Sequence, residues 1–398
     1  MLQYKKGEEM KKKVLFVIWS FTAGGGAEKI LANICNNIDI NKYEIDILEI
    51  ENFDIKKEHV SNAINILKPL SIVNNKKYFE KKNILVKFLI RLKNKIIKIM
   101  LYSCPKILRK IILNRKYDIE VAFNYYMPSI FVASSNKSKK ICWVHSSIED
   151  LDYHINNNYT TKLRYINQKK AFNKMDNIVA ISNKTRRSII NLYPEVNSKI
   201  VNINNGFDFD TIRNLSEEKI GWINERVTII AIGRLVEQKN FSLLIDAAEI
   251  LRSKNVDFEM LIIGEGYQRE LLNMKISKLK MDNYIKLIGY VNNPYPYLKK
   301  SDVICLTSIA EGFPTVIAEA LILGCPFVAT NVAGIEELSD GGKCGIIVET
   351  TKESIANGLE TIILDNEMRK KMSSNCFNTI KRYTIDEQIN KINKVFEE

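Results

Sequence analysis

The strongest constraint on the fold is an alternation of short apolar segments with helical patterns, which runs through the chain twice. Short runs rich in Val, Ile and Phe are typical of buried parallel strands, and the segments between several of them have helical spacing. The expected strands of the first half are 14–18, 43–50, 119–123, 141–144, 178–181 and 200–203. After a polar stretch near 205–222 the alternation restarts, with strands at 227–232, 258–263, 285–288 and 302–306 and helices at 242–251, from 268 and from 314.

This repeated alternation predicts the α/β class, with two doubly wound, Rossmann-like parallel sheets facing each other across a cleft. A chain of 398 residues is long enough for two domains with sizeable cores. We expect an acceptor-side domain at 1–207 and a donor domain at 208–382. The final helix, within 383–398, is expected to pack back on the first domain.

Composition excludes several classes of protein. An apolar share of 46% and a charged share of 26% are those of a soluble globular chain, with no visible signal peptide. The most apolar stretch, 303–335, contains two glutamates and two prolines and is not a membrane span. Seven scattered cysteines without a CxxC pair argue against zinc and disulfides, and predict reduced, mostly buried thiols in a cytoplasm.

Two cations stand directly after the first expected strand of the second half. Arg234 follows the strand end, and Lys239 comes five residues later in the same loop. Ligands of open parallel sheets bind at the carboxyl ends of the strands. Two cations there suit a diphosphate, whose negative charge grows as it leaves. Taken alone, the pair is better explained as a surface arginine and a surface lysine.

Two glutamates frame a predicted helix start in the same half. The segment EGFPT at 311–315 precedes the helix, Pro314 suits its first residue and Gly324 its end. The backbone amides around 313–316 would form a helix N-terminus that attracts phosphate. Glu311 lies before the helix and Glu319 about two turns inside it, so one carboxylate can reach a sugar hydroxyl and the other a ribose. Taken alone, the two glutamates are better explained as a capping acid and a solvated helical residue.

Two glycine-containing turns add weaker evidence. Gly264-Glu265-Gly266 follows an expected strand, but Arg269 occupies the place of the third glycine of a dinucleotide-binding pattern. We interpret it as a tight turn near a nucleotide base. The NNGFD segment at 204–208 ends a strand, and a turn at a domain edge explains it equally well.

In this order and spacing, the motifs resemble the family 4 retaining glycosyltransferases of the GT-B fold, over nearly the whole chain. In the second half the resemblance lies in GRLVEQKN, IIGEG, LIGYV, Ser301-Asp302, EGFPTVIAEAL and ATNVAG. In the first half it lies in GGGAEK, VHSS, VAISN and NNGFD. Bacterial enzymes that build capsule, lipopolysaccharide or other lipid-carried glycans look most similar, particularly through the NNPYPYL stretch.

The resemblance implies a nucleotide-diphosphate sugar, with UDP favoured, bound on the second domain. Arg234 and Lys239 would neutralise the diphosphate, Glu311 would hold hydroxyls of the donor sugar, and Glu319 would hold the ribose. His145 would meet the transferring sugar from the first domain, with a structural histidine as the alternative. The other implied donor-binding residues are Gly25, Gly26, Gly264, Gly312, Phe313, Thr315 and Val316.

The implied reaction is a retaining transfer to a glycan or a lipid-diphosphate-linked acceptor, without a cofactor or a metal ion. The leaving diphosphate can itself take the acceptor proton, so catalysis would come mainly from positioning and electrostatics. Asp208 and Asp210 spell the DxD of metal-dependent transferases, but they belong to the NNGFD turn, and we expect no metal there. Another GT-B enzyme, such as a nucleotide-sugar epimerase or a phosphorylase, and an inactive scaffold relative remain as alternatives.

The basic excess of the chain is local. Segment 81–116 holds 12 of the 59 basic residues and no acidic one, which leaves 47 basic against 46 acidic residues elsewhere. An amphipathic basic helix suits an anionic membrane surface, where each cation contributes about 1 kcal/mol. The alternative is a helix whose apolar face packs on the protein core and whose charged face lies in solvent. Binding to nucleic acid is disfavoured, because no nucleic-acid-binding motif accompanies the charge. The expected apolar face is Leu85, Phe88, Leu89, Leu92, Ile96 and Ile99, and the cationic stripe beside it is Lys87, Arg91, Lys95 and Lys98.

We therefore expect a cytoplasmic protein that binds peripherally to the inner face of the cell membrane.

Overall fold

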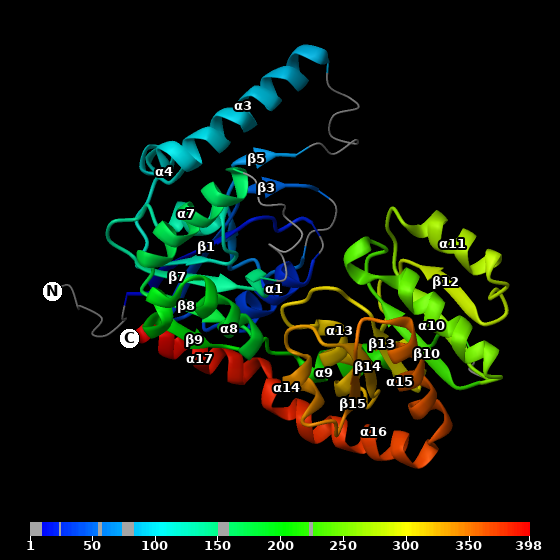
Figure 1. Ribbon diagram of the computed structural model, residues 1–398. Helices are drawn as coiled ribbons and strands as arrows, with labels where there is room; N and C mark the ends of the chain where they lie inside the picture. Colours follow the sequence, from blue (N-terminus) through cyan, green and yellow to red (C-terminus); the bar gives the residue numbers. More distant parts are fainter. Residues whose placement is uncertain (1–9, 24, 55–57, 74–82, 150–158, 223–225) are drawn as a thin grey trace.

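The computed structural model describes residues 10–23, 25–54, 58–73, 83–149, 159–222 and 226–398. Two α/β halves lie side by side, each built on a parallel sheet with helices against it (Figure 1). This is the predicted α/β class, with two Rossmann-like parallel sheets. Gly24 of the expected glycine turn, and Lys81 and Lys82 of the basic segment, lie outside the described residues.

The first sheet has the strand order β4-β2-β1-β6-β7-β8-β9, and every neighbouring pair is parallel. Its strands are β1 (Lys12–Ile18), β2 (Tyr43–Glu49), β4 (Asn65–Ile66), β6 (Ile119–Ala122), β7 (Lys139–Val144), β8 (Asn177–Ala180) and β9 (Ile200–Asn202). A separate pair is formed by β3 (Glu51–Asn52) and β5 (Ser71–Ile72). The helices of this half are α1 (Gly26–Asn37), α3 (Ile84–Ser103), α4 (Pro105–Ile112), α5 (Met127–Val132), α7 (Tyr159–Asn173), α8 (Asn183–Leu192) and the 3-10 turn η1 (Pro194–Lys199). All six expected strands are present, to within two residues at each end.

The second sheet has the order β12-β11-β10-β13-β14-β15, again parallel throughout. Its strands are β10 (Thr228–Ile232), β11 (Glu259–Ile263), β12 (Ile285–Gly289), β13 (Val303–Leu306), β14 (Phe327–Thr330) and β15 (Gly345–Val348). The helices are α9 (Phe209–Ser216), η2 (Glu237–Lys239), α10 (Phe241–Ser253), α11 (Arg269–Lys278), α12 (Tyr295–Lys300), α13 (Thr315–Ile322), α14 (Ile335–Ser339), α15 (Lys352–Leu364), α16 (Asn366–Ile380), η3 (Lys381–Tyr383) and α17 (Ile385–Glu397).

The start of α13 differs from the prediction by one residue. Pro314 is the N-cap rather than the first helical residue, because its ψ of 97° is extended. Glu319 therefore lies just over one turn inside the helix, not two. The predicted stop is confirmed, since Gly324 adopts a φ of +77°, which favours glycine.

Both sheets have the same switch point. The chain places β1 between β2 and β6, and β10 between β11 and β13, so the connections leave in opposite directions from these strands. In open parallel sheets the crevice at such a point, beyond the carboxyl ends of the strands, is where ligands bind. The loops after β1, β10 and β13 are therefore placed to form a site.

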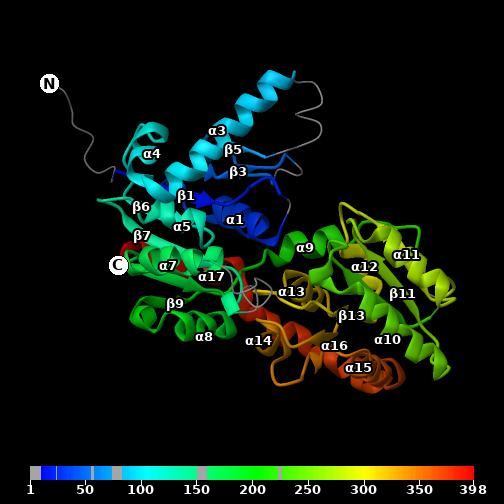
Figure 2. The same cartoon turned by 45° about the horizontal axis from the view of Figure 1, so that its top comes forward.

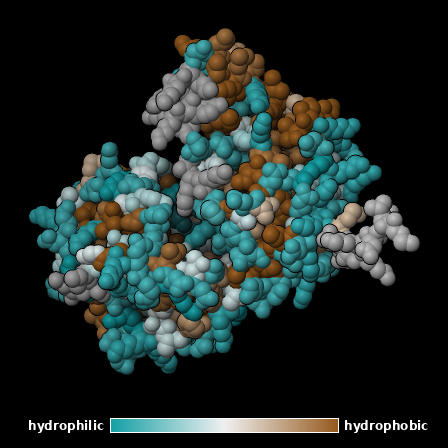
Figure 3. Space-filling view, turned by 180° about the vertical axis from the view of Figure 1, so that it is seen from behind, coloured by the Kyte–Doolittle hydropathy of each residue, from teal (hydrophilic) through white to brown (hydrophobic). Residues whose placement is uncertain are grey.

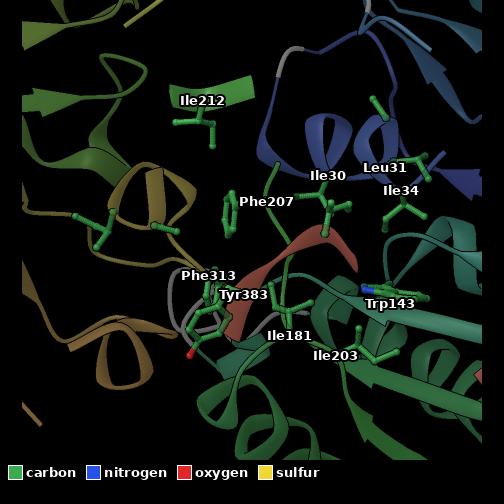
Figure 4. Packing of buried hydrophobic residues seen from close by; sticks show 14 of the residues in the cluster. Ile30, Leu31, Ile34, Trp143, Ile181, Ile203, Phe207, Ile212, Phe313 and Tyr383 are labelled. Atoms are coloured by element: carbon green, nitrogen blue, oxygen red, sulfur yellow. The ribbon is translucent and has the colours of Figure 1, made fainter. Parts of the chain in front are cut away.

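One apolar cluster extends through both halves. The Phe313 ring lies 6.3 Å from the Phe207 ring and 5.4 Å from the Tyr383 ring, measured between centroids. Figure 4 shows these three side chains together at the junction, next to Ile181 and the α1 residues. All seven cysteines are unpaired and six of them are buried, as expected.

The α3 helix stands on the outer side of the first half, away from the second half (Figures 1 and 2). Its predicted apolar face is solvent-exposed, from 43% at Leu92 to 66% at Leu85, and only Ile97 and Leu101 of the helix are buried. Figure 3 shows the resulting apolar patch at the top of the molecule. The core-facing alternative for this face is therefore wrong. Within the described residues, no helix combines the length and apolar character needed to cross a bilayer.

The last helix, α17, lies against the first half. The Phe396 ring is 5.5 Å from the Tyr43 ring and 6.5 Å from the Phe16 ring, and the Lys12 ammonium donates to the Phe396 carbonyl. At the start of α17, Gly206 donates its N–H to the Gln388 side chain. These contacts join the C-terminal end of the chain to its first strands.

We expect Phe396→Ala to lower the free energy of unfolding by about 3–5 kcal/mol, because a ring that is 2% exposed leaves a cavity. Urea denaturation followed by circular dichroism measures the change. Phe88→Ala is the matched control, since that ring is 59% exposed and its loss should change stability by less than about 0.5 kcal/mol. Equal effects of the two substitutions would contradict the packing of α17 described above.

Candidate functional site

The loops after β10 and β13 lie against each other and bring Lys239 and Glu311 together. The Lys239 ammonium is 2.5 Å from Glu311 Oε1, which also accepts a hydrogen bond of 2.7 Å from the Ser308 hydroxyl. The Thr307 hydroxyl donates to the Lys239 carbonyl. Two of the predicted donor-binding side chains are thus paired with each other at the carboxyl end of the sheet.

Arg234 lies in the same loop but takes no part in this pair. Its side chain is exposed, and among the described residues it has no hydrogen-bonded or ion-pair partner. Since Glu311 already offsets the charge of Lys239, Arg234 is the cation of this loop that is available to an anionic ligand.

The N-terminus of α13 lies beside this pair. Its cap residue, Pro314, supplies no side-chain hydrogen bond, so the first-turn amides of Thr315 and Val316 have no side-chain cap. Such amides, together with the helix dipole, attract phosphate. The Phe313 side chain is 5% exposed and faces the core, so only its backbone can contact a ligand.

The two glycines after β11 allow close packing of two loops. A Cβ at Gly264, which has a φ of +148°, would lie 1.9 Å from the Gly233 carbonyl oxygen. A Cβ at Gly266 would lie 2.3 Å from the Leu235 carbonyl oxygen. This turn therefore supports the backbone on either side of Arg234, and Gly264 also lines the cavity described below.

The first half touches this region through backbone. A Cβ at Gly312 would lie 1.6 Å from the His145 carbonyl oxygen, so only glycine allows this approach across the cleft. A Cβ at Gly26 would lie 4.0 Å from the Thr315 methyl group, which puts the start of α1 opposite the start of α13. Gly25 is the N-cap of α1, where a Cβ would lie 2.6 Å from the Glu28 carboxylate.

His145 follows β7 directly, as predicted, and its ring is held inside the cleft wall. The ring lies 4.5 Å from the Phe123 ring, and Nε2 is buried without a partner among the described residues. Burial lowers the pKa of His145 to about 3, against a smaller opposing effect of its hydrogen bond to the Phe123 backbone. The imidazole is therefore neutral at physiological pH.

Glu319 is contacted from the other half of the molecule. The Lys29 ammonium of α1 forms an ion pair with Glu319 Oε1 and donates a 2.8 Å hydrogen bond to the Tyr295 hydroxyl. That hydroxyl also donates to Glu319 Oε1 at 3.4 Å. The Glu319 side chain is only 5% exposed.

A cavity of about 740 Å³ opens between the halves beside these groups. It is bounded by Ala23 and Lys29 on one side and by Arg234, Gly264 and the segment 290–295 on the other. The lining is mostly apolar, and its charged residues are Lys29, Glu58, Arg234 and Glu265. A cavity with this lining can hold an aromatic base against apolar side chains and a diphosphate against a cation.

The structure gathers the predicted residues of the second half, and Gly25, Gly26 and His145, around one cleft. Lys29, Tyr290 and Tyr295 of this cavity were not among the predicted site residues. One available signal was the position of Lys29 in the GGGAEK segment, three residues after Gly26 and therefore near the same helix start.

Comparison with known proteins gives two family matches. Residues 24–211 match the family described as glycosyltransferase family 4, and residues 213–379 match the family described as glycosyl transferases group 1.

Individual relatives match shorter stretches. The Campylobacter jejuni enzyme N-acetylgalactosamine-N,N'-diacetylbacillosaminyl-diphospho-undecaprenol 4-alpha-N-acetylgalactosaminyltransferase is 35% identical over 36% of this chain and 39% of its own length. The Staphylococcus aureus capsular polysaccharide biosynthesis glycosyltransferase CapM is 28% identical over 53% of this chain and 58% of its own. The chain thus aligns with less than two thirds of either relative.

The solved structure of Anabaena Alr3699/HepE in complex with UDP and glucose is similar in fold. Its TM-score is 0.71 at 18% identity, and the alignment covers 97% of this chain and 100% of that one.

His145 should make stability depend on pH. The unfolded chain protonates this imidazole as the pH falls through about 6.5, while the folded protein does so only near pH 3. The stability due to neutral His145 is therefore complete above about pH 6.5 and is lost as the pH falls toward 3. Between pH 7 and 4.5, the melting temperature of wild type should fall more than that of His145→Gln, as measured by calorimetry.

His59→Gln is the matched control, because His59 is exposed. Its melting temperature should follow that of wild type across the same pH range. Parallel curves for wild type and His145→Gln would contradict a buried neutral imidazole.

Proposed function

Since the chain belongs to the glycosyltransferases that join a family 4 domain to a group 1 domain, we propose that it transfers a sugar from a UDP-sugar to a glycan or lipid-linked acceptor. The observation that carries this proposal is a cavity between the two halves that is lined by Arg234 and by Lys29 and Tyr295, the two residues that hold Glu319 of α13. A cation and free amides suit the diphosphate of such a donor, and a buried carboxylate suits its ribose.

The proposed donor lies with its base in the cavity near Tyr290 and Gly264. Its diphosphate then meets Arg234 and the first amides of α13, and its ribose hydroxyls donate to Glu319. The sugar points toward Glu311 and His145. The His145 imidazole is neutral, and its buried Nε2 has no partner among the described residues. Nε2 can therefore accept a hydrogen bond from a sugar hydroxyl.

The proposed chemistry is transfer with retention of configuration. The bond from the anomeric carbon to the diphosphate oxygen breaks, the acceptor oxygen bonds to that carbon on the same face, and the acceptor proton passes to the leaving diphosphate. Arg234 and the α13 amides would stabilise the growing charge, which requires no enzymic base. The contact between Gly312 and the His145 backbone supports a closed cleft that limits hydrolysis.

We propose that this transfer requires no resident metal. The DxD-like pair supports this, because Asp208 is the N-cap of α9 and accepts hydrogen bonds from the Thr211 N–H and hydroxyl. The capping role accounts for an aspartate at this position without a metal ion.

The acceptor is proposed to be presented at an anionic membrane surface, as part of bacterial surface or lipid-linked glycan assembly. The C. jejuni relative is named for a diphospho-undecaprenol acceptor, and CapM for capsule biosynthesis. The exposed apolar face of α3 beside Lys87, Arg91, Lys95 and Lys98 supports docking on such a surface.

Thermal shift with UDP, GDP and ADP in EDTA tests donor binding. UDP should raise the melting temperature of wild type, because it binds only the folded state. Arg234→Ala and Glu319→Ala should each bind UDP about 10–100-fold more weakly, the range for losing hydrogen bonds to a charged group. Arg252→Ala, at the end of α10 and outside the cavity lining, is the control and should bind as wild type does.

No shift with any nucleotide would contradict the proposed function, and a shift that EDTA abolishes would contradict metal independence. A nucleotide-sugar epimerase or a phosphorylase would bind nucleotide or sugar but release no UDP on addition of an acceptor.

Binding to vesicles that contain phosphatidylglycerol should weaken when the four cations of the α3 stripe, Lys87, Arg91, Lys95 and Lys98, are replaced by Gln. Each charge contributes about 1 kcal/mol, so the loss should be about 4 kcal/mol at most. Vesicle co-sedimentation measures this. The control variant has the same net charge and should bind as wild type does. It replaces four exposed lysines of the second half and α17 by Gln, which are Lys278, Lys371, Lys381 and Lys391. Equal losses in both variants would show a general charge effect and contradict docking through α3.

A further inference from the structure

Lys29 is a charged residue of the glycine-loop motif to which the proposed function gives no role. It lies in the first turn of α1, in the first half, while both of its partners, Tyr295 and Glu319, lie in the second half. Its contacts therefore exist only while the two halves are together.

The contacts leave part of the Glu319 carboxylate unused. Lys29 and Tyr295 both bind Oε1, and among the described residues no hydrogen bond reaches Oε2. A carboxylate held in this way by one oxygen can still accept hydrogen bonds from a ribose with the other. Lys29 thus orients the acceptor of these hydrogen bonds rather than occupying it.

Burial makes Glu319 dependent on this partner. Its side chain is 5% exposed, while that of Lys29 is 39% exposed and extends along the cavity wall. Although burial lowers the pKa of Lys29, the Glu319 carboxylate and the Tyr295 hydroxyl raise it more, so the ammonium stays charged. If the halves separated, Glu319 would lose the cation that compensates its burial.

We propose that Lys29 is a positioning residue of the donor site, which holds Glu319 from across the cleft so that the ribose-binding carboxylate is complete only when the two halves close. This inference rests on the proposed function and adds a residue of the first half to the binding of the nucleotide. Nucleotide binding and closure then favour each other, because each depends on the same carboxylate.

The test compares dissociation constants for UDP and for 2′,3′-dideoxy-UDP, measured by calorimetry on the full chain. If wild type prefers GDP, the guanosine pair is used instead. The variants are Lys29→Met, which has a similar length without charge, and Lys29→Arg, which keeps the charge. Arg187→Met is the matched control, because Arg187 also pairs across the halves, with Glu336 at 3.3 Å, but at an exposed position outside the cavity lining.

We expect Lys29→Met to bind UDP about tenfold more weakly, the effect of losing one oriented hydrogen bond to a charged group, and to bind dideoxy-UDP nearly as wild type does. The preference for UDP over the dideoxy analogue, which reports the ribose contact directly, should therefore fall. Lys29→Arg should keep most of this preference, and Arg187→Met should keep all of it. A merely structural role would weaken both ligands equally.

Three outcomes would overturn the inference. Unchanged or tighter UDP binding by Lys29→Met, with the preference retained, would exclude the positioning role and leave the proposed function standing. Equal losses in Lys29→Met and Arg187→Met would show only a general contact between the halves. If wild type binds neither UDP nor GDP, the proposed function fails and this inference fails with it.

Discussion

The packing of the Phe313 ring against Phe207 and Tyr383 is the contact on which the arrangement of the cleft depends. Phe207 ends the segment that leaves the first sheet, Tyr383 precedes the helix that returns to it, and Phe313 stands just before α13. Because all three rings are buried in one core, the start of α13 is held at the junction of the two halves.

Around this junction glycine allows backbones to approach closely. Gly312 admits the His145 carbonyl of the other half, and Gly264 admits the Gly233 carbonyl of its own half. With the backbones this close, charged side chains contact each other across and within the cleft. The pairs Lys29–Glu319 and Lys239–Glu311 offset their own charges, which leaves Arg234 as the cation of the cavity lining without an ion-pair partner among the described residues.

The basic segment 81–116 has two different roles that its composition does not distinguish. Arg109 forms an ion pair with the buried Glu120 of β6, and Arg115 lies 2.8 Å from the buried Asp46 of β2. These two cations compensate carboxylates inside the first half. The cations of α3, in contrast, lie on its exposed surface beside an apolar face that has no cover among the described residues. Helical spacing predicts that α3 is amphipathic, but it does not predict which face of α3 packs against the protein. That depends on the packing of the whole first half.

By itself, the sequence determined the class of the fold, six of the seven strands of the first sheet and the segments of the second half that line the cleft. These follow from local rules, because apolar runs form buried parallel strands and their carboxyl ends form the crevice. It did not reveal the cap position of Pro314, which follows from the extended ψ of 97° that this residue adopts in the folded chain. Nor did it reveal the pairing of Lys29 with Glu319, because residues 290 positions apart meet only when two separately folded sheets are brought face to face. Only the tertiary structure decided which charges pair with each other and which remain for a ligand.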